Sequence, residues 1–483
     1  MDTEPRQAVQ PMAMKKELSR LPITAVDSRG RGRGTAVAGD DTERAVYVTG
    51  AYPGDVVDLK VRRQKGAWHG EITSFHPGTG PRRRPPFCAH FADCGGCTIQ
   101  DIGYLDQLAL KEAIVTAAFT EAGFPELSDA TDRYPILPAP AERRYRNKLE
   151  FSFGAHRWLS EAEIAEAETI TDRRGLGFHA HGRFDRVIDL TECHLQPEPS
   201  ESIRSFLREY SLREGLSFYD AREHHGLMRL LIIRTSLSGE TMVIVMFGED
   251  DPDEIGRVMT AVSDRFPEIT SLNYVVNTSR NDALAPHLVH RVRGAEWITE
   301  QCGPNTLRIR PKAFYQTNPA QAVNLYQRAV DLAALRGNEV VYDLYCGIGS
   351  IALFVAPLVR HVVGIELVED AIVAARENAG VNEIRNVTFR AGAVEDVLPD
   401  AIAEQGPPDL VFLDPPRVGL HPNARRTLRE LAPERIVYVS CNPRTQAADI
   451  ADLGDLYEIA AMQPVDMFPQ TRHVESIVLL RRR

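Results

Sequence analysis

Residues 339–350 read EVVYDLYCGIGS, and this stretch decides the fold of the C-terminal part of the chain. An apolar run ends at Asp343-Leu344, a Gly-x-Gly turn follows, and residues 351–359 have the pattern of a helix packed behind a strand. The alternation of strand and helix begins at about residue 305. We expect further strands at residues 361–365, 387–390, 409–413, 435–439 and 475–480, and a second helix at residues 370–379. This order predicts a doubly wound α/β sheet.

Unusual residues follow these strands at their carboxyl ends, the edge at which open α/β sheets bind ligands. Gly347 and Gly349 let a ligand approach the backbone, and Glu366 can accept hydrogen bonds from ribose hydroxyls. The third glycine of a dinucleotide fingerprint is absent, which argues against a nicotinamide cofactor. Asp414, made rigid by Pro415-Pro416, either accepts an N–H from a base edge or caps the next turn.

Cys441 lies where the strand at residues 435–439 stops, because Asn442-Pro443 cannot continue a strand. Its thiol is a candidate nucleophile, although most cysteines are buried core residues. Glu475 reaches the same edge only if the last strand runs antiparallel, and is otherwise a solvated carboxylate. A thiolate facing a carboxylate base suits alkylation of the unreactive C5 carbon of a pyrimidine. The thiolate adds to C6, C5 takes a methyl group from a sulfonium donor, and the base removes the C5 proton.

The N-terminal part is expected to form a disordered tail at residues 1–20 and a small β-barrel at residues 21–77. Five stretches, at residues 23–26, 35–38, 45–48, 56–61 and 69–73, alternate like strands between glycine-rich turns. Arginine and lysine are in excess on this OB-like barrel, and Trp68 and His69 offer stacking surfaces. The barrel is therefore expected to bind RNA. A solvated basic face is the alternative.

Three cysteines, Cys88, Cys94 and Cys97, lie close together around a Gly-Gly pair that lets the backbone wrap tightly. Clustered thiolates indicate a metal ion or an iron–sulfur cluster, and both need a fourth ligand. Cys193 is the best candidate, because it follows a strand-like stretch at residues 186–190. Spacing alone does not choose between zinc, which is the more frequent, and iron; chance clustering is the remaining alternative.

Residues 78–300 are expected to form an α+β middle domain that carries these cysteines. Strands are predicted at residues 149–153, 176–178, 230–235, 241–247 and 271–276, and helices at residues 101–123, 200–210 and 253–265. The cationic segment at residues 143–148 suits phosphate and base contacts, or forms a surface network of salt bridges. The catalytic sheet then occupies residues 301–483.

The amino-acid composition limits the classes of protein to which this chain can belong. The 483 residues are 43% hydrophobic and 25% charged, as in globular proteins of several domains. The net charge of −11 argues against a general polyanion binder unless charge is segregated by domain. The sequence has no apolar run of about 18 residues and no apolar signal region, so we expect no membrane contact and a cytoplasmic location. Seven cysteines in such a chain are expected as thiols.

Five motifs together resemble the RNA uracil-C5 methyltransferase family, in particular its ribosomal-RNA branch, which carries a TRAM barrel and an iron–sulfur cluster. They are FYQTN at residues 314–318, DLYCGIG at 343–349, LDPPR at 413–417, SCNP at 440–443 and HVE at 473–475. The resemblance covers nearly the whole chain from Leu21. It implies a class I methyltransferase domain with a Rossmann-like fold at the C-terminus.

The resemblance also implies roles for single residues. Cys441 is similar to the family's nucleophile and Glu475 to its proton acceptor, while Phe314 would stack on a flipped uracil. The side chains expected to hold S-adenosylmethionine are Gln316, Tyr345, Glu366 and Asp414. The expected ligands of a [4Fe–4S] cluster are Cys88, Cys94, Cys97 and Cys193. Two departures from the family pattern, Ser350 and the absence of a polar side chain at residues 392–393, leave the adenine contacts open.

The implied activity is methylation of C5 of a specific uridine in 23S ribosomal RNA by a monomeric enzyme, and the alternative is the same reaction on transfer RNA. An enzyme that methylates an exocyclic amine would carry an aromatic residue where Arg417 stands and would leave Cys441 without a role. An RNA-binding protein with a redox-sensing cluster is the non-enzymatic alternative.

Overall fold

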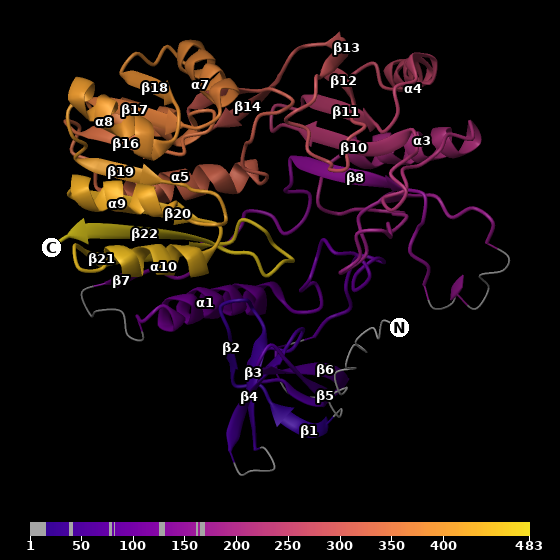
Figure 1. Cartoon of the computed structure of the whole chain (residues 1–483), viewed down its shortest axis with the longest axis horizontal. Coiled ribbons are helices and arrows are strands. Elements are labelled where there is room, and N and C mark those ends of the chain that lie inside the picture. Colours follow the sequence, from indigo (N-terminus) through magenta and orange to yellow (C-terminus); the bar gives the residue numbers. More distant parts are fainter. Residues whose placement is uncertain are drawn as a thin grey trace, which may run out of the picture.

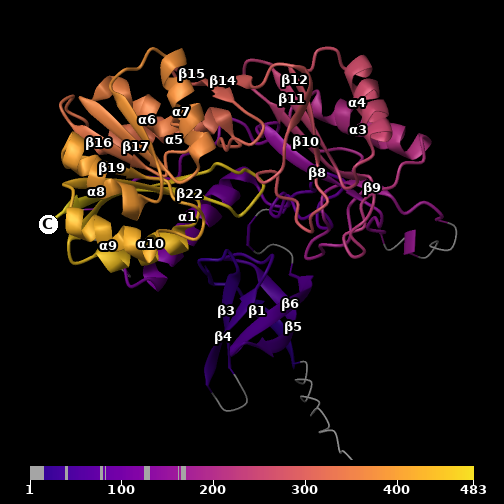
Figure 2. The ribbon, with the colours of Figure 1, turned by 45° about the horizontal axis from the view of Figure 1, so that its top comes forward.

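A computed structural model describes residues 16–37, 42–76, 80–81, 83–124, 131–160, 163–164 and 170–483. In the described residues, three large sheets and one two-stranded sheet make up the molecule, and the three large sheets are well separated in Figure 1. The N-terminal sheet lies at the bottom of the view, the middle sheet at the upper right and the C-terminal sheet at the upper left. Figure 2 shows the same three parts after a rotation. In the described residues, no helix is long and apolar enough to cross a membrane.

The C-terminal sheet has eight strands in the order β18-β17-β16-β19-β20-β22-β21-β7. Neighbours from β18 to β20 pair in parallel, whereas β22 runs antiparallel to β20 and to β21. The predicted doubly wound sheet is confirmed, and the last strand runs antiparallel, which was the condition for Glu475 to reach the edge. The bounds are β16 Val340–Leu344, β17 His361–Glu366, β18 Val387–Ala391, β19 Leu410–Leu413, β20 Arg435–Ser440, β21 Tyr457–Val465, β22 Glu475–Arg482 and β7 Asp132–Arg133.

Helices cover both faces of this sheet because successive strand residues point to opposite sides. Val341 and Phe412 join one core, with helices α5, α6 and α7, and Tyr342 and Leu413 join the other, with α1, α8, α9 and α10. The bounds are α1 Tyr104–Glu121, α5 Pro319–Ala333, α6 Ser350–Val355, α7 Glu369–Val381, α8 Val394–Gln405, α9 Pro422–Leu431 and α10 Pro443–Leu453, with a short 3₁₀ helix at Ala356–Leu358.

Two elements from residues 78–300 pack with the C-terminal sheet, which differs from the predicted domain boundary. Strand β7 pairs with β21, and α1 lies against α10 at the lower face of the sheet in Figure 1. Strand β21 itself was not predicted. The sequence YEIAAMQPV lacks the run of β-branched residues that marks the other strands, and β21 is instead stabilised by pairing with β22.

A fully buried ion pair joins α1 to the chain beyond β21. Lys111 donates to Asp466, and burial lowers the pKa of the lysine ammonium. Tyr104 also donates to Asp466, at 2.9 Å. Removal of either partner would leave the other charge unpaired in the core. Helix α1 is therefore tied to the C-terminal sheet by electrostatics as well as by apolar packing.

We expect Lys111→Met to lower the stability of the protein by about 3–5 kcal/mol, the cost of breaking a buried pair by removing one partner. The measurement is the thermal unfolding midpoint. The double variant Lys111→Met, Asp466→Leu is the control, because it removes the stranded carboxylate as well. If the double variant lost as much stability as the two single changes added together, the pair would not be coupled.

The N-terminal sheet has six strands, one more than predicted, in the order β1-β5-β6-β4-β3-β2. Its edge strands β1 and β2 are separated only by Ile23 and Thr24, so the sheet must curl back on itself. Residues 16–20 lie in β1 and not in a disordered tail, because Leu18 pairs with Leu59 and packs on the core; residues 1–15 lie outside the described part. The bounds are β1 Lys16–Pro22, β2 Ala25–Val26, β3 Gly32–Val37, β4 Glu43–Val48, β5 Val56–Gln64 and β6 Ala67–Phe75.

The middle sheet has the order β13-β12-β11-β10-β8-β9, and its five predicted strands and two later helices are confirmed. A hairpin, β14–β15, leads from it to the C-terminal sheet. The bounds are β8 Lys148–Gly154, β9 Gly175–Gly177, β10 Met228–Thr235, β11 Thr241–Phe247, β12 Ser271–Val276, β13 His290–Gly294, β14 Ile298–Cys302, β15 Asn305–Ile309, α3 Ser200–Arg213 and α4 Pro252–Arg265.

Candidate active site

Five neighbouring strands place the predicted site residues along one edge of the C-terminal sheet. In the sheet order β17-β16-β19-β20-β22, the residues at this edge are Glu366, Tyr345, Asp414, Cys441 and Glu475. Four of them lie at or just after the carboxyl end of a parallel strand, and the fifth begins the antiparallel strand. The structure therefore brings residues from 345 to 475 to one edge, as the sequence predicts.

The pairing of β20 with β22 sets Cys441 opposite Glu475. Ser440 pairs with Ser476, so the next position in this antiparallel register matches residue 441 with residue 475. Asn442 begins α10 directly after the cysteine, and its side chain accepts a hydrogen bond from the Arg444 N–H. The strand end and the helix start thus hold the thiol from both sides.

Burial, with smaller contributions from neighbouring charges, raises the pKa of both groups in this pair. Burial raises the pKa of the Cys441 thiol to about 12, the Glu475 charge adds to the rise, and the Arg417 guanidinium opposes it. Glu475 is only 2% exposed, and burial raises its carboxyl pKa well above the ordinary value, with Asp414 adding to the rise. A carboxylate with a raised pKa holds a captured proton well, which suits a general base.

Asp414 is partly buried just before the two prolines, and desolvation raises its pKa to about 7. Gln316 donates a hydrogen bond to it at 3.4 Å, and this bond lowers the carboxyl pKa. Gln316 comes from the segment before α5, whose start is capped by Asn318. The two side chains predicted to hold the same cofactor are therefore in contact.

The pH dependence of the rate tests this contact. If Asp414 acts as a carboxylate, the rate at saturating substrates rises through about pH 7, since protonation below that pH removes the acceptor. Gln316→Leu removes the bond that lowers the pKa. We expect the midpoint to move up by roughly one unit, because a hydrogen bond to a charged group is worth about 1.5–3 kcal/mol. Gln321→Leu, a buried amide on α5 bonded to Leu137 and Pro138, is the matched control, and an unmoved midpoint in Gln316→Leu would contradict the assignment.

The turn after β16 has the backbone of a ligand cradle. Tyr345, Gly347 and Gly349 have φ values of 69°, 54° and 83°, a region that strains a side chain such as tyrosine. A Cβ at Gly347 would meet nothing within 4 Å, so the turn opens onto free space there. The Gly347 N–H donates to Glu366 at 3.2 Å, which aims that carboxylate at the turn.

Asp343 lies beneath this turn, fully buried at the end of β16. One carboxylate oxygen accepts from the Ala352 N–H at 2.8 Å, and the other has no hydrogen-bond partner in the described structure. Burial raises the pKa of this carboxyl well above its usual range. The unpartnered oxygen and the open turn fit a polar ligand such as the amino acid and ribose parts of S-adenosylmethionine.

Arg417 and His473 are site residues to which the sequence reasoning gave no role. Arg417 donates to His473 Nδ1 at 2.8 Å, and Asn442 donates to the Arg417 carbonyl at 2.8 Å. Burial and the nearby guanidinium lower the His473 pKa to about 4, so the ring is neutral and accepts this bond. Arg417 lies in the LDPPR motif and His473 in the HVE motif, and membership of these motifs was the signal that could have identified them as site residues. Phe314, predicted to stack on a base, is 69% exposed and free to do so.

The four predicted cluster cysteines lie within electrostatic range of one another. Burial raises the pKa of Cys97 to about 11 and that of Cys193 to about 12, and neighbouring thiols contribute to both shifts. Cys88 and Cys94 are shifted in the same direction. Among the described residues, no group of three or more His, Cys, Asp or Glu side chains is arranged to hold a metal ion. Residues 186–190, expected as a strand before Cys193, form only isolated bridges at Val187.

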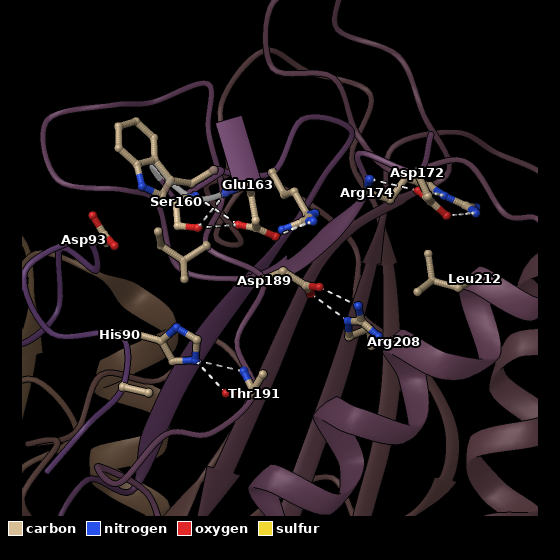
Figure 3. Close-up of a pocket in the computed structure, with 14 residues that line it drawn as sticks. His90, Asp93, Ser160, Glu163, Asp172, Arg174, Asp189, Thr191, Arg208 and Leu212 are labelled. Atoms are coloured by element: carbon tan, nitrogen blue, oxygen red, sulfur yellow. Dashed lines mark hydrogen bonds and ion pairs between the residues drawn. The ribbon is translucent and has the colours of Figure 1, made fainter. Parts of the chain in front are cut away.

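A hollow of about 520 Å³ lies in the middle domain, beside the loop that carries His90 and Asp93 (Figure 3). None of its lining residues belongs to the catalytic edge. Each of its three arginines is paired with a carboxylate, in the pairs Arg157–Glu163, Arg174–Asp172 and Arg208–Asp189. These pairs neutralise the cationic lining, so the hollow does not compete with the sheet edge as the candidate active site.

Comparisons with known proteins agree with the geometry of the edge. A family model described as tRNA (uracil-5-)-methyltransferase matches residues 303–483. A protein of Porphyromonas gingivalis named as an uncharacterized RNA methyltransferase is 44% identical over 449 residues, which span 91% of this chain and 96% of that protein. A protein of Bacteroides thetaiotaomicron with the same name is 42% identical over 443 residues, 91% of this chain and 97% of its own length.

A solved structure is also similar over most of the chain. The tRNA (uracil-54, C5)-methyltransferase of Pyrococcus abyssi, in complex with S-adenosyl-L-homocysteine, matches with a TM-score of 0.69 and 26% identity. The match covers 95% of this chain and all of that one. The similarity therefore extends over the N-terminal and middle sheets as well as the catalytic sheet.

Proposed function

Because this chain belongs to the RNA uracil-C5 methyltransferase family, we propose that it methylates C5 of a specific uridine in 23S ribosomal RNA. Cys441 is the nucleophile and Glu475 the proton acceptor. Gln316, Tyr345, Glu366 and Asp414 bind S-adenosylmethionine, which supplies the methyl group as an electrophilic sulfonium. The enzyme acts as a monomer in the cytoplasm.

The reaction balances with these two side chains. The Cys441 thiol loses its proton and its sulfur bonds to C6 of uracil, so that the C5–C6 double bond becomes an enolate with carbanion character at C5. C5 takes the methyl group, and the sulfonium becomes a neutral thioether. Glu475 then removes the C5 proton, the double bond re-forms, and the C6–S bond breaks to return the thiolate. The thiol proton goes to solvent in the first step and a proton returns to the sulfur after the last, while Glu475 releases the C5 proton, so the net products are methylated uracil, the demethylated donor and one proton.

The register of β20 and β22 carries this proposal. Its last pair, Ser440 with Ser476, lies directly next to Cys441 on one strand and Glu475 on the other, and β19, which ends just before Asp414, pairs with β20. A nucleophile on one strand and a base on its antiparallel neighbour can act on C6 and C5 of one pyrimidine ring, since these atoms are bonded to each other. An enzyme for exocyclic amines needs neither residue.

The N-terminal sheet supports an RNA substrate, and we assign it as a TRAM, or OB-like, RNA-binding barrel. Its exposed cations include Arg33, Lys60, Arg62 and Arg63. The ring of Tyr47 lies 6.1 Å from that of His69, and the Arg31 guanidinium lies 4.5 Å from the Tyr47 ring centre. Exposed cations beside neighbouring aromatic rings suit single-stranded RNA.

Transfer RNA is the second candidate substrate, because the Pyrococcus abyssi structure is named for a transfer-RNA uridine. Methyl transfer from labelled S-adenosylmethionine separates the two when 23S ribosomal RNA and bulk transfer RNA from a strain lacking the gene are compared. Label in ribosomal RNA alone supports the proposal. Label in transfer RNA alone would assign the alternative.

We also propose that Cys88, Cys94, Cys97 and Cys193 hold a [4Fe–4S] cluster. The four-thiol donor set has the chemistry of such a group. Burial raises the pKa of all four thiols, and neighbouring thiols add to the rise for Cys94, Cys97 and Cys193, so free thiolates are costly there without a cation. A four-iron cluster spaces its thiolates more widely than a single ion does. Its role is structural, because the methyl transfer involves no electron-transfer step. Anaerobically purified protein is expected to contain about four irons per chain, and zinc without iron would refute the assignment.

A further inference from the structure

The loop at residues 466–474 leads directly into Glu475, the first residue of β22. It joins β21 to β22, and Val465 pairs with Glu475 at the point where the two strands meet. Burial and the charges of Asp414 and Arg417 account for the shifted pKa of the Glu475 carboxyl, and no hydrogen bond to a described residue contributes. The position of this carboxylate is therefore set by the backbone that leads into β22.

Gln470 is the central anchor of the loop. Its side chain is fully buried, and its φ of 70° is unfavourable for a residue with a side chain. Gln107 on α1 holds it from two sides: the Gln470 N–H donates to Gln107 Oε1 at 2.9 Å, and Gln107 Nε2 donates to Gln470 Oε1 at 2.9 Å. A strained backbone persists only when its partners over-determine it, and this amide pair does so.

The segment that follows Cys97 reaches the same residue. The N–H groups of Thr98 and Ile99 donate to the Gln470 carbonyl at 2.9 and 3.1 Å. Gln107 Nε2 also donates to the Ile99 carbonyl at 3.0 Å. Gln107 thus joins the loop at residues 466–474 to the segment that follows Cys97. These two segments lie far apart in the sequence.

Other parts of the molecule hold the two flanks of the loop. Tyr145, in the cationic segment of the middle domain, donates to the Pro469 carbonyl at 2.9 Å. Arg472 donates to the Gly30 carbonyl of the N-terminal sheet at 3.2 Å. Elements that surround the catalytic sheet therefore converge on the loop that ends at the proton acceptor.

We propose that Gln107 and Gln470 are positioning residues that hold Glu475 in place for removal of the C5 proton. The inference rests on the proposed function, because it takes Glu475 as the proton acceptor. A displacement of about 1 Å far from the reacting atoms can slow a step by about 100-fold. Since Glu475 acts only after methyl transfer, loss of its position slows that last step and leaves the earlier steps nearly unchanged.

The experiment compares two RNA substrates with Gln107→Leu. RNA that contains 5-fluorouridine forms a covalent adduct through the first two steps and stops there, because C5 carries no proton to remove. Ordinary uridine RNA requires all three steps. We expect adduct formation with the fluorinated RNA to stay within about 3-fold of the unchanged enzyme, and turnover of ordinary RNA to fall by about 10- to 100-fold with accumulation of its adduct.

A second variant keeps the inference testable if Gln107→Leu folds poorly, and a third substitution serves as its control. Gln470→Gly removes the bond from Gln107 Nε2 to Gln470 Oε1, keeps the backbone N–H bond to Gln107 Oε1, and accepts the positive φ, so we expect the same selective loss at smaller size. Asn386→Leu is the matched control. Asn386 donates to the Ala356 and Val359 carbonyls before β18, away from the catalytic edge, and its loss should leave both measurements unchanged.

A double variant separates positioning from general damage. In the Glu475→Gln background the acceptor is already gone, so adding Gln107→Leu is expected to change turnover by less than about 2-fold. Parallel loss of adduct formation and turnover in Gln107→Leu and in Gln470→Gly would overturn the inference, and so would unchanged turnover. If the unchanged enzyme formed no adduct with fluorinated RNA, the proposed function itself would fail, which is a different result from a selective loss.

Discussion

We expect Cys441→Ser to lower methylation of RNA by at least about 10⁴-fold, the size of loss seen when a covalent nucleophile is removed. A serine hydroxyl is far harder to ionise than a thiol, and the site already raises the thiol pKa to about 12. The burial and the Glu475 charge that disfavour a thiolate would disfavour an alkoxide still more. C6 of uracil would then have no nucleophile, and C5 would stay unreactive.

Two measurements check this result. Methyl transfer is followed with labelled S-adenosylmethionine, and the covalent complex with 5-fluorouridine RNA is followed on a denaturing gel. Binding of S-adenosylmethionine should persist, because Gln316, Tyr345, Glu366 and Asp414 are unchanged. Cys302→Ala, at a buried cysteine of the β14–β15 hairpin, is the control and should keep both activities. Methyl transfer that survived in Cys441→Ser would rule out the covalent route.

We expect Glu475→Gln to cause the second large loss of turnover. This variant should be blocked at the last step of the reaction and not at the first. Turnover is expected to fall by about 10²–10⁴-fold, the usual contribution of a general base. Adduct formation should survive, because the Cys441 nucleophile is intact and burial, the main cause of its raised pKa, is unchanged. Glutamine keeps the shape of the side chain in a fully buried place. The enzyme should therefore become trapped on ordinary uridine RNA.

The trapped species is measured as a protein–RNA complex that resists denaturant and carries the labelled methyl group. Its presence with ordinary uridine distinguishes the variant from the unchanged enzyme, which releases its product. Complex without label would assign the block to methyl transfer, and absence of any complex would show that Glu475 is needed before elimination. Either outcome would remove Glu475 from the role of the last proton acceptor.

The residues at the candidate edge could be predicted from the sequence because their signals are local. Gly347 and Gly349, Pro415-Pro416 and Asn442-Pro443 each end a buried apolar run, and parallel strands bring their carboxyl ends to one side. Glu475 was the exception, since its place depended on the direction of the last strand. The structure shows that strand to be antiparallel, and Cys441 and Glu475 then share a register position.

Contacts between distant segments could not be predicted from the sequence. The alternating charges before Leu21 suggested a tail, yet residues 16–20 form a strand because β5 offers a partner. Helix α1 has an amphipathic pattern that does not name its partner, and Lys111 meets Asp466 across 355 residues. The amino acid sequence by itself determined the catalytic fold and the residues at its edge, because strand periodicity and turn chemistry act over a few residues. Only the tertiary structure decided the register of Cys441 with Glu475 and the anchoring of Gln470, because both depend on pairings between segments that the chain brings together only on folding.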